Sequence, residues 1–173
     1  MSKAFTRDSD DAPEVPPPPR LTAPLPPGVK NYITAGGAQR LRDDFERLVQ
    51  SERPRIAALP DPEARRRELQ SLDQRIAQLQ QSLQTAVVVA PQPPGDDQVR
   101  FGATITVQDA RGQETRYRIV GMDETDLDRG WISWRSPIAR ALLNARRGQT
   151  LRVRLPLGEE EMKIVKVHYE ADQ

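Results

Sequence analysis

Two neighbouring groups of residues near the middle of the chain have types and a spacing that could support chemistry. Asp61 and Glu63 are carboxylates two positions apart, and oxygen donors of this kind are the ligands that Mg²⁺ accepts in proteins. A structural interpretation is also open, in which Asp61 caps a helix and Glu63 lies near the positive end of its dipole. The basic run that follows could contact phosphates or acidic protein groups, or form a solvated helix face; it consists of Arg65, Arg66 and Arg67.

A second acidic cluster lies later in the chain, at Asp123, Glu124, Asp126 and Asp128. A calcium-binding loop would need a different spacing and a Glu at its twelfth position, which is absent here. We therefore predict a solvated hairpin loop for this segment. His168 lies near the end of the last predicted strand, and we expect it to be structural.

The composition excludes most catalysis by side chains. Among 173 residues there is no Cys, which removes disulfides, thiol nucleophiles and Cys-based metal sites. A single His cannot supply a multi-His metal site, and a Ser/His/Asp mechanism would depend on that one residue. We therefore expect a protein that is not an enzyme and has no metal site or cofactor of its own.

The charge and hydropathy of the sequence do not by themselves indicate a binding partner. The chain has 26 basic and 25 acidic residues, and the two kinds nearly balance within residues 1–30, 31–95 and 96–173. A protein that fills a DNA groove usually has a basic stripe, and none dominates in the sequence. No apolar run approaches the roughly 18 residues of a membrane span, and the N-terminus has no apolar signal core. We predict a soluble, cytoplasmic protein that does not associate with membranes.

Residues 1–30 are the first of three predicted segments. They hold eight of the sixteen prolines, and Pro lacks an amide donor and favours extended geometry. The composition predicts a disordered arm that acts as a linker, although a proline-binding partner is also conceivable.

Residues 31–90 are predicted to form an antiparallel coiled-coil hairpin. Thr34 caps the first helix, and Pro60-Asp61-Pro62 separates it from the second. Because a short turn joins the two helices, they must lie antiparallel. Pro54 is expected to kink the first arm, and residues 86–89 could form a short strand. Apolar residues follow helical spacing in both arms: Leu41, Phe45, Leu48, Ile56 and Leu59, then Leu69, Leu72, Ile76, Leu79 and Leu83.

Residues 96–173 are predicted to form a small α+β domain, an antiparallel sheet with one helix. Ser136 caps the helix and Pro137 takes its first position. Trp131 and Trp134 stand at odd spacing on one strand, so we expect one in the core and one exposed as an interface anchor. The base of the hairpin is expected to pack against this domain. Strands are predicted at residues 101–107, 115–120, 131–134, 151–155 and 162–169.

Several sequence blocks occur in a fixed order along residues 28–173. The hairpin contributes Tyr32-Ile33-Thr34, Glu52-Arg53-Pro54 and residues 69–75 (LQSLDQR). The C-terminal part contributes residues 101–107 (FGATITV) and 117–121 (YRIVG), Asp123-Glu124, Ile132-Ser133, residues 136–143 (SPIARALL), and Arg147-Gly148. Together they resemble the GreA/GreB family of transcript-cleavage factors, and most closely its GreB-like branch.

The resemblance implies a fold and a partner. The C-terminal part would be an FKBP-like domain that docks at the mouth of the secondary channel of bacterial RNA polymerase, while the hairpin enters the channel. The basic run of the hairpin could then contact nascent RNA, and the family is also associated with DNA binding. We expect the protein itself to be a monomer. The residues at the docking edge would be Trp134, Arg135, Ser136, Pro137 and Arg140.

The predicted tip departs from the family pattern. Cleaving members carry a Gly-Asp-x-Ser-Glu-Asn motif whose acidic residues help to hold the second Mg²⁺ and to orient the attacking water. No such stretch occurs in residues 50–70. The hairpin is about a dozen residues shorter than in relatives, a deficit of roughly 9 Å when divided over two arms. GreB-type relatives often carry Asp before Ser-Pro, where this chain has Arg135, and this charge reversal alters electrostatic complementarity.

Three functions are open at this point. The favoured one is a Gre-like regulator of elongation that binds RNA polymerase at the secondary channel without stimulating transcript cleavage. In the second, the protein is a true GreB-type factor that stimulates cleavage through Asp61 and Glu63, with the Mg²⁺ of the polymerase as the only cofactor. The third, a peptidyl-prolyl isomerase, follows only from FKBP-like architecture, and the chain has few aromatic residues for such a pocket.

Overall fold

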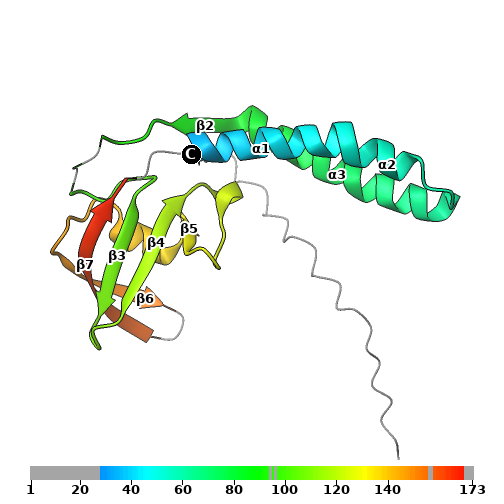
Figure 1. The fold of residues 1–173 in the computed structure, drawn as a ribbon. Helices are drawn as coiled ribbons and strands as arrows, with labels where there is room; N and C mark the ends of the chain where they lie inside the picture. Colours follow the sequence, from blue (N-terminus) through cyan, green and yellow to red (C-terminus); the bar gives the residue numbers. More distant parts are fainter. Residues whose placement is uncertain (1–27, 94, 96, 156–157, 170–173) are drawn as a thin grey trace, which may run out of the picture.

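The computed structural model describes residues 28–93, 95, 97–155 and 158–169. A helical hairpin extends from a curled five-stranded sheet, so the molecule combines helices and strands in two distinct regions (Figure 1). The predicted arm lies outside the described residues apart from its last three positions. Within the described ranges, no helix is both long enough and apolar enough to cross a membrane.

The first arm of the hairpin changes its helical form in the middle because of Pro54. A proline has no N–H to donate, and its ring clashes with the carbonyl group four residues earlier. The turn before it therefore widens into a π-helix, in which the N–H of Arg53 bonds to the carbonyl of Leu48. The arm consists of three successive segments: α1 (Ala35–Arg47), the π-helix η1 (Leu48–Glu52) and α2 (Arg53–Ala57).

The π-helix keeps the apolar residues of the first arm in line. Leu41 and Leu48 are seven residues apart, whereas Ile56 follows Leu48 after eight. A π turn accommodates one extra residue, so all three side chains reach the same buried face, with 8%, 3% and 6% of their surface exposed. The kink predicted at Pro54 is thus a local widening that preserves the packing of the arm.

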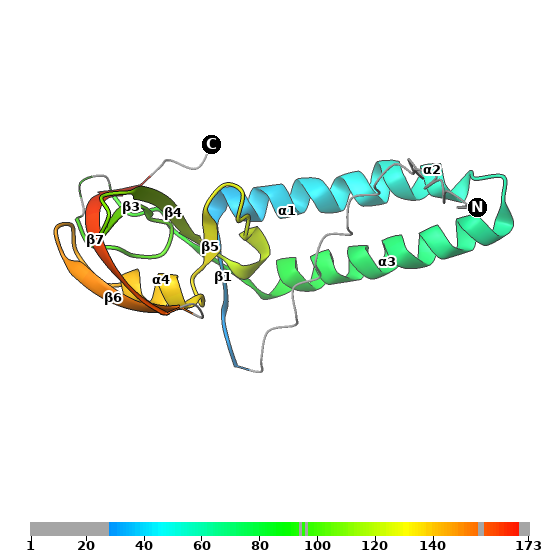
Figure 2. The same cartoon turned by 90° about the horizontal axis from the view of Figure 1, so that it is seen from below.

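The second arm is the helix α3 (Pro62–Thr85), which begins where the sequence predicted it to begin. It runs beside the first arm (Figure 2). Leu72 is buried on α3 and packs with Leu48 and Ile56 of the first arm. The other apolar residues of the predicted α3 stripe are partly buried at the same seam: Leu69, Ile76, Leu79 and Leu83.

A small parallel sheet closes the base of the hairpin. β1 (Asn31–Thr34) precedes the first helix and pairs in parallel with β2 (Ala86–Val89), which follows the second. The short strand predicted at residues 86–89 is therefore confirmed. Thr34, the last residue of β1, caps α1 as predicted, and its hydroxyl accepts the N–H of Gly37 at 2.9 Å.

The C-terminal sheet has the strand order β5-β4-β3-β7-β6 and is mixed, not antiparallel as predicted. β5 runs parallel to β4, while the other neighbours are antiparallel. The connection from β4 to β5 contains its own reversal, a bridge between Asp126 and Trp131, so β5 leaves it in the direction of β4. The strands are β3 (Thr104–Asp109), β4 (Glu114–Val120), β5 (Trp131–Ser133), β6 (Thr150–Leu155) and β7 (Gly158–His168).

The core of the sheet region lies on one face only. Ile105, Ile119 and Ile164 point to this face and are fully buried. The short helix α4 (Pro137–Leu142) covers it beside β6 and adds Leu142 to the same cluster (Figure 2). Because side chains alternate along a strand, the residues between these positions lie on the opposite face.

Candidate functional site

The two predicted carboxylates lie at the hairpin tip, between the end of α2 and the first turn of α3. Asp61 is the N-cap of α3, and its Oδ1 accepts a hydrogen bond from the N–H of Glu63 at 3.0 Å. Arg65 folds back over the turn, donating from Nη1 to the carbonyl of Leu59 at 3.1 Å. Of the predicted basic run, Arg65 is thus tied to the tip, whereas the following two arginines are exposed.

The tip offers a small donor set for a metal ion. One carboxylate oxygen of Asp61 is engaged as the helix cap, which leaves its second oxygen and the exposed carboxylate of Glu63. Mg²⁺ requires near-octahedral oxygen coordination, which proteins often complete with phosphates. These two residues could therefore only supplement ligands that a partner supplies. Across the part of the chain that the structure describes, no group of three or more His, Cys, Asp or Glu residues is placed to hold a metal.

The five residues predicted for docking lie around the beginning of α4. Ser136 is the N-cap and accepts a backbone N–H three residues further on at 3.1 Å. Pro137, in the first position of the helix, and Arg140 are exposed. Arg135 is half-buried, so its charge is held close to the protein surface beside the capped helix end.

The two tryptophans do not divide into one core residue and one exposed residue, as we had predicted. Both are half-buried. Trp134 meets the ring of Tyr32 edge to face, with centroids 5.4 Å apart, and Tyr32 also contacts Phe101 at 6.2 Å. Trp134 is therefore occupied at the junction of hairpin and sheet, which reduces the surface that it can offer to a partner.

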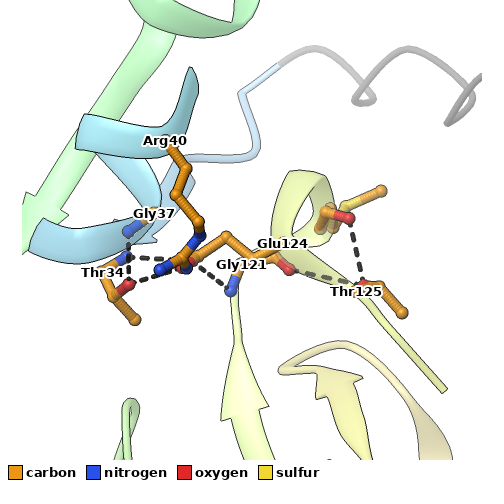
Figure 3. A network of polar contacts seen from close by, with 7 residues as sticks. Thr34, Gly37, Arg40, Gly121, Glu124 and Thr125 are labelled. Atoms are coloured by element: carbon orange, nitrogen blue, oxygen red, sulfur yellow. Dashed lines mark hydrogen bonds and ion pairs between the residues drawn. The ribbon is translucent and has the colours of Figure 1, made fainter. Parts of the chain in front are cut away.

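Glu124 is a residue whose role the sequence did not reveal. The predicted solvated loop is wrong at this position, because Glu124 lies in the 3₁₀ helix η2 (Met122–Glu124) and its side chain is only 2% exposed. Its Oε2 accepts the backbone N–H groups of Thr34 and Gly121, both at 2.9 Å. Its Oε1 accepts the hydroxyl of Thr34 and lies 3.2 Å from Nη2 of Arg40 (Figure 3). One carboxylate thus joins the hairpin to the sheet region.

Two glycines make room for this carboxylate. A Cβ atom on Gly37 would overlap the carboxylate of Glu124, and one on Gly121 would overlap the carbonyl oxygen of Tyr32. Gly37 sits in the first turn of α1, where glycine is an unfavourable helix residue. That mismatch between residue and element is the signal in the sequence that could have pointed to a close contact here.

Two of the sequence blocks of the hairpin, Glu52-Arg53-Pro54 and residues 69–75, contact each other across the two arms. Nε of Arg53 lies 2.9 Å from Oδ1 of Asp73, although the residues are 20 positions apart. The hydrogen bond to Asp73 and the charge of its carboxylate raise the pKa of Arg53. In the same turn, Arg55 lies 2.7 Å from Glu52, and the hydrogen bond and charge of Arg55 lower the pKa of Glu52. The Arg53–Asp73 pair joins the two arms, whereas the Arg55–Glu52 pair lies within the first arm. Both lie at the surface, where ion pairs contribute little to stability.

The structure thus joins a helical hairpin with a capped tip to a curled sheet. Comparisons with known proteins identify the family. A family model described as "Transcription elongation factor, GreA/GreB, C-term" matches residues 93–169. The chain is 39% identical over 154 residues to a transcription elongation factor GreB from Neisseria meningitidis serogroup A, covering 81% of this chain and 94% of that protein.

A further relative is a transcription elongation factor GreA from Anaeromyxobacter sp. (strain K), 37% identical over 151 residues, with 79% of this chain and 91% of that protein covered. Among solved structures, the GreA factor homolog 1 (Gfh1) of Thermus thermophilus aligns with a TM-score of 0.39 at 24% identity, covering 81% of this chain and 99% of that one. On the sequence matches, the chain belongs to the GreA/GreB family of transcription elongation factors and is GreB-like.

Proposed function

We propose that this protein regulates transcription elongation by binding bacterial RNA polymerase at its secondary channel, without stimulating transcript cleavage. The observation that carries the second half of the proposal is the hydrogen bond from the N–H of Glu63 to Asp61. It ties one oxygen of Asp61 to the start of α3, so that only its second oxygen and the carboxylate of Glu63 remain for a metal ion.

The sheet region supplies the docking surface in this proposal. We take it to be FKBP-like and the hairpin to be a coiled coil, in keeping with the family resemblance. Pro137 and Arg140 are exposed at the start of α4 and would contact the polymerase directly. Arg135 places a positive charge at this edge, which would favour an acidic partner surface and would slow or weaken docking on a basic one.

The rest of the proposal concerns the context in which the factor acts. It would work as a cytoplasmic monomer, and the exposed part of the basic run, Arg66 and Arg67, would lie near RNA inside the channel. It would not be an enzyme, since any cleavage chemistry belongs to the polymerase. The rival function, stimulation of cleavage through Asp61 and Glu63, makes a different prediction in a cleavage assay.

Competition for the polymerase tests the binding half of the proposal. A fluorescently labelled, cleaving Gre factor bound to polymerase is titrated with this protein, and we expect displacement. The Arg135→Asp variant should displace the label at a lower concentration, because it restores the charge common in GreB-type relatives. Arg152→Asp, an exposed change of the same charge on β6, should behave like the unchanged protein. If the unchanged protein and Arg135→Asp both leave the label bound, docking at the channel is wrong.

A further inference from the structure

The strand β2, at the base of the hairpin, has one open edge. It pairs with β1 in a parallel sheet of only two strands, and across the described ranges no other strand is hydrogen-bonded to it. Figure 1 shows β2 along the upper border of the molecule. An edge strand directs backbone N–H and C=O groups outward, where they can pair with a strand of another chain.

The side chains of β2 are also incompletely covered. Val87 is 40% exposed and Val88 is 47% exposed. Because neighbouring side chains point to opposite faces of a strand, both faces are partly open at these positions. Parallel sheets in proteins are usually covered on both faces, and a sheet of two strands is marginally stable by itself. A further strand would complete this small sheet.

The opposite edge of the sheet is already occupied. The N–H of Thr34 in β1 donates to Oε2 of Glu124 at 2.9 Å, and the side chain of Asn31 donates to Asp123 at 3.1 Å. The 3₁₀ helix η2 therefore lies against β1 on the side away from β2. In the part of the chain that the structure describes, only the β2 edge is open to another strand, so growth of the sheet through β2 ends after one pairing.

The sequence around β2 contains no charged residue. No Asp, Glu, Lys or Arg occurs between Arg75 and Asp96, although 29% of the whole chain is charged. Natural edge strands are often protected against association by a charged side chain, most commonly Lys. The edge of β2 lacks this protection, and it also has no charge with which to select an oppositely charged partner.

The absence of charge favours a second copy of this chain as the partner. When two copies of one strand pair antiparallel around a two-fold axis, the residue on the axis lies opposite its own copy. A charged residue on the axis would therefore face a like charge, which destabilises a strand pair, whereas pairs of β-branched residues stabilise it. The three consecutive valines of β2, residues 87–89, meet this requirement.

The alternation of side chains limits the possible registers. A two-fold axis perpendicular to the sheet keeps each side chain on its own face, so a residue lies opposite itself or a position an even number of residues away. The axis is placed at Val88, the most exposed of the three valines. Val87 then lies opposite Val89 of the second copy. Pro91 follows soon after and has no N–H to extend the pairing.

We propose that two copies of the protein associate through β2, with Val88 on the two-fold axis, to form a four-stranded sheet in the order β1-β2-β2-β1. The inference goes beyond the proposed function, because it concerns the free protein and not the monomer bound to polymerase. Self-association is measured without polymerase, so the failure of either proposal leaves the other standing. Since β2 is only four residues long, the interface is small and the dimer should be weak.

The test is sedimentation velocity of the full-length protein over a series of concentrations. We expect a shift from monomer to dimer with a dissociation constant of about 50 µM, as for a small, transient interface. Val88→Lys and Val88→Glu should each weaken the dimer about tenfold or more, because each places like charges opposite one another at the axis. Val88 is half-exposed in the free chain, so both variants should fold.

Mixing the two variants tests the register. In an equimolar mixture, the lysine introduced in one chain lies opposite the glutamate introduced in the other, so we expect dimerisation to return to within about threefold of the unchanged protein. A mixture of Val87→Lys and Val87→Glu should restore dimers to a smaller extent, because position 87 lies opposite Val89 of the second copy in this register.

Val165→Lys is the matched control, since Val165 is a valine of similar exposure, 38%, on the strand β7. It should dimerise like the unchanged protein. A monomer at every concentration would overturn the proposal and would leave the open edge to a segment of the same chain or to a different partner. An equal loss in Val165→Lys, full dimerisation of Val88→Lys, or a Val88 mixture that stays monomeric would also overturn it.

Discussion

Glu124 connects parts of the chain that lie far apart in the sequence. It accepts hydrogen bonds from Thr34, about ninety residues earlier, and from Gly121 within its own 3₁₀ turn. The charge of this carboxylate is compensated by Arg40, whose side chain is partly exposed. Because the carboxylate and its donors on Thr34 and Gly121 are buried, we expect Glu124 to matter more for stability than any exposed ion pair of the hairpin.

Replacing Glu124 should therefore destabilise the fold. Glu124→Ala leaves two buried N–H groups and a hydroxyl without their acceptor, and we expect a loss of about 3 kcal/mol in the free energy of unfolding. Glu124→Gln keeps one acceptor oxygen and should lose less. Urea denaturation measures both. Asp128→Ala, in the same connection but exposed, is the control, and an equal effect in Asp128→Ala would contradict the role given to Glu124.

Gly37 allows a second prediction about a single residue. The expected change in stability on replacing it with Ala is opposite to the change that helix propensity predicts. Gly37→Ala inside a helix would ordinarily stabilise by about 1 kcal/mol. Here the new Cβ would overlap the carboxylate of Glu124, so we expect a loss of about 1–3 kcal/mol, as for overpacking. Thermal unfolding measures the change. In the Glu124→Ala background the penalty should disappear, and a stabilising effect of Gly37→Ala in the unchanged protein would contradict the contact.

Among the elements, the first arm shows how an irregular turn can preserve a regular interface. The π-helix η1 absorbs the extra residue between Leu48 and Ile56 and returns Ile56 to the seam with α3. If this register holds, Ile56→Ala should lower the free energy of unfolding by about 2–5 kcal/mol, the usual loss when a buried side chain is truncated. Val49→Ala, on the exposed side of the π turn, should stay within about 0.5 kcal/mol. Chemical denaturation of both variants checks the register, and similar small effects would contradict it.

Local signals were sufficient to predict where the helices begin. Thr34, Asp61 and Ser136 cap α1, α3 and α4 as their residue types predicted, because an N-cap acts on amides only two or three residues away. The pairing of β1 with β2 and the parallel placement of β5 were not predicted. Both depend on contacts between distant segments, and alternation along a strand carries no information about its neighbour's direction.

At the scale of the whole molecule, the hairpin is held to the sheet by more than one kind of contact. The ring of Tyr32 packs between those of Phe101 and Trp134, and Nδ2 of Asn31 donates to Asp123 at 3.1 Å. With the Glu124 hydrogen bonds, these contacts set the direction in which the hairpin leaves the sheet (Figure 1). The proposed function requires such a fixed junction, because the hairpin tip must be positioned while the sheet region docks.

The candidate sites were predictable to different degrees. The candidate residues of the tip and of the proposed docking edge lie close together in the sequence, so they could be named as candidates from the sequence alone. The grouping of side chains on the outer face of the sheet was not predictable, because the charge totals over residues 96–173 include both faces. Arg116, Arg118 and Lys166 become neighbours only through strand pairing, which charge totals do not reveal.

The most direct test of the central claim is RNA cleavage in a stalled, backtracked elongation complex. The protein would be added alone, as the Asp61→Ala/Glu63→Ala variant, and in competition with a cleaving Gre factor. We predict no stimulation above the polymerase's own rate, an identical result for the variant, and suppression of cleavage by the competing factor. Stimulated cleavage that disappears in the variant would contradict the account and would make Asp61 and Glu63 a working metal-binding tip.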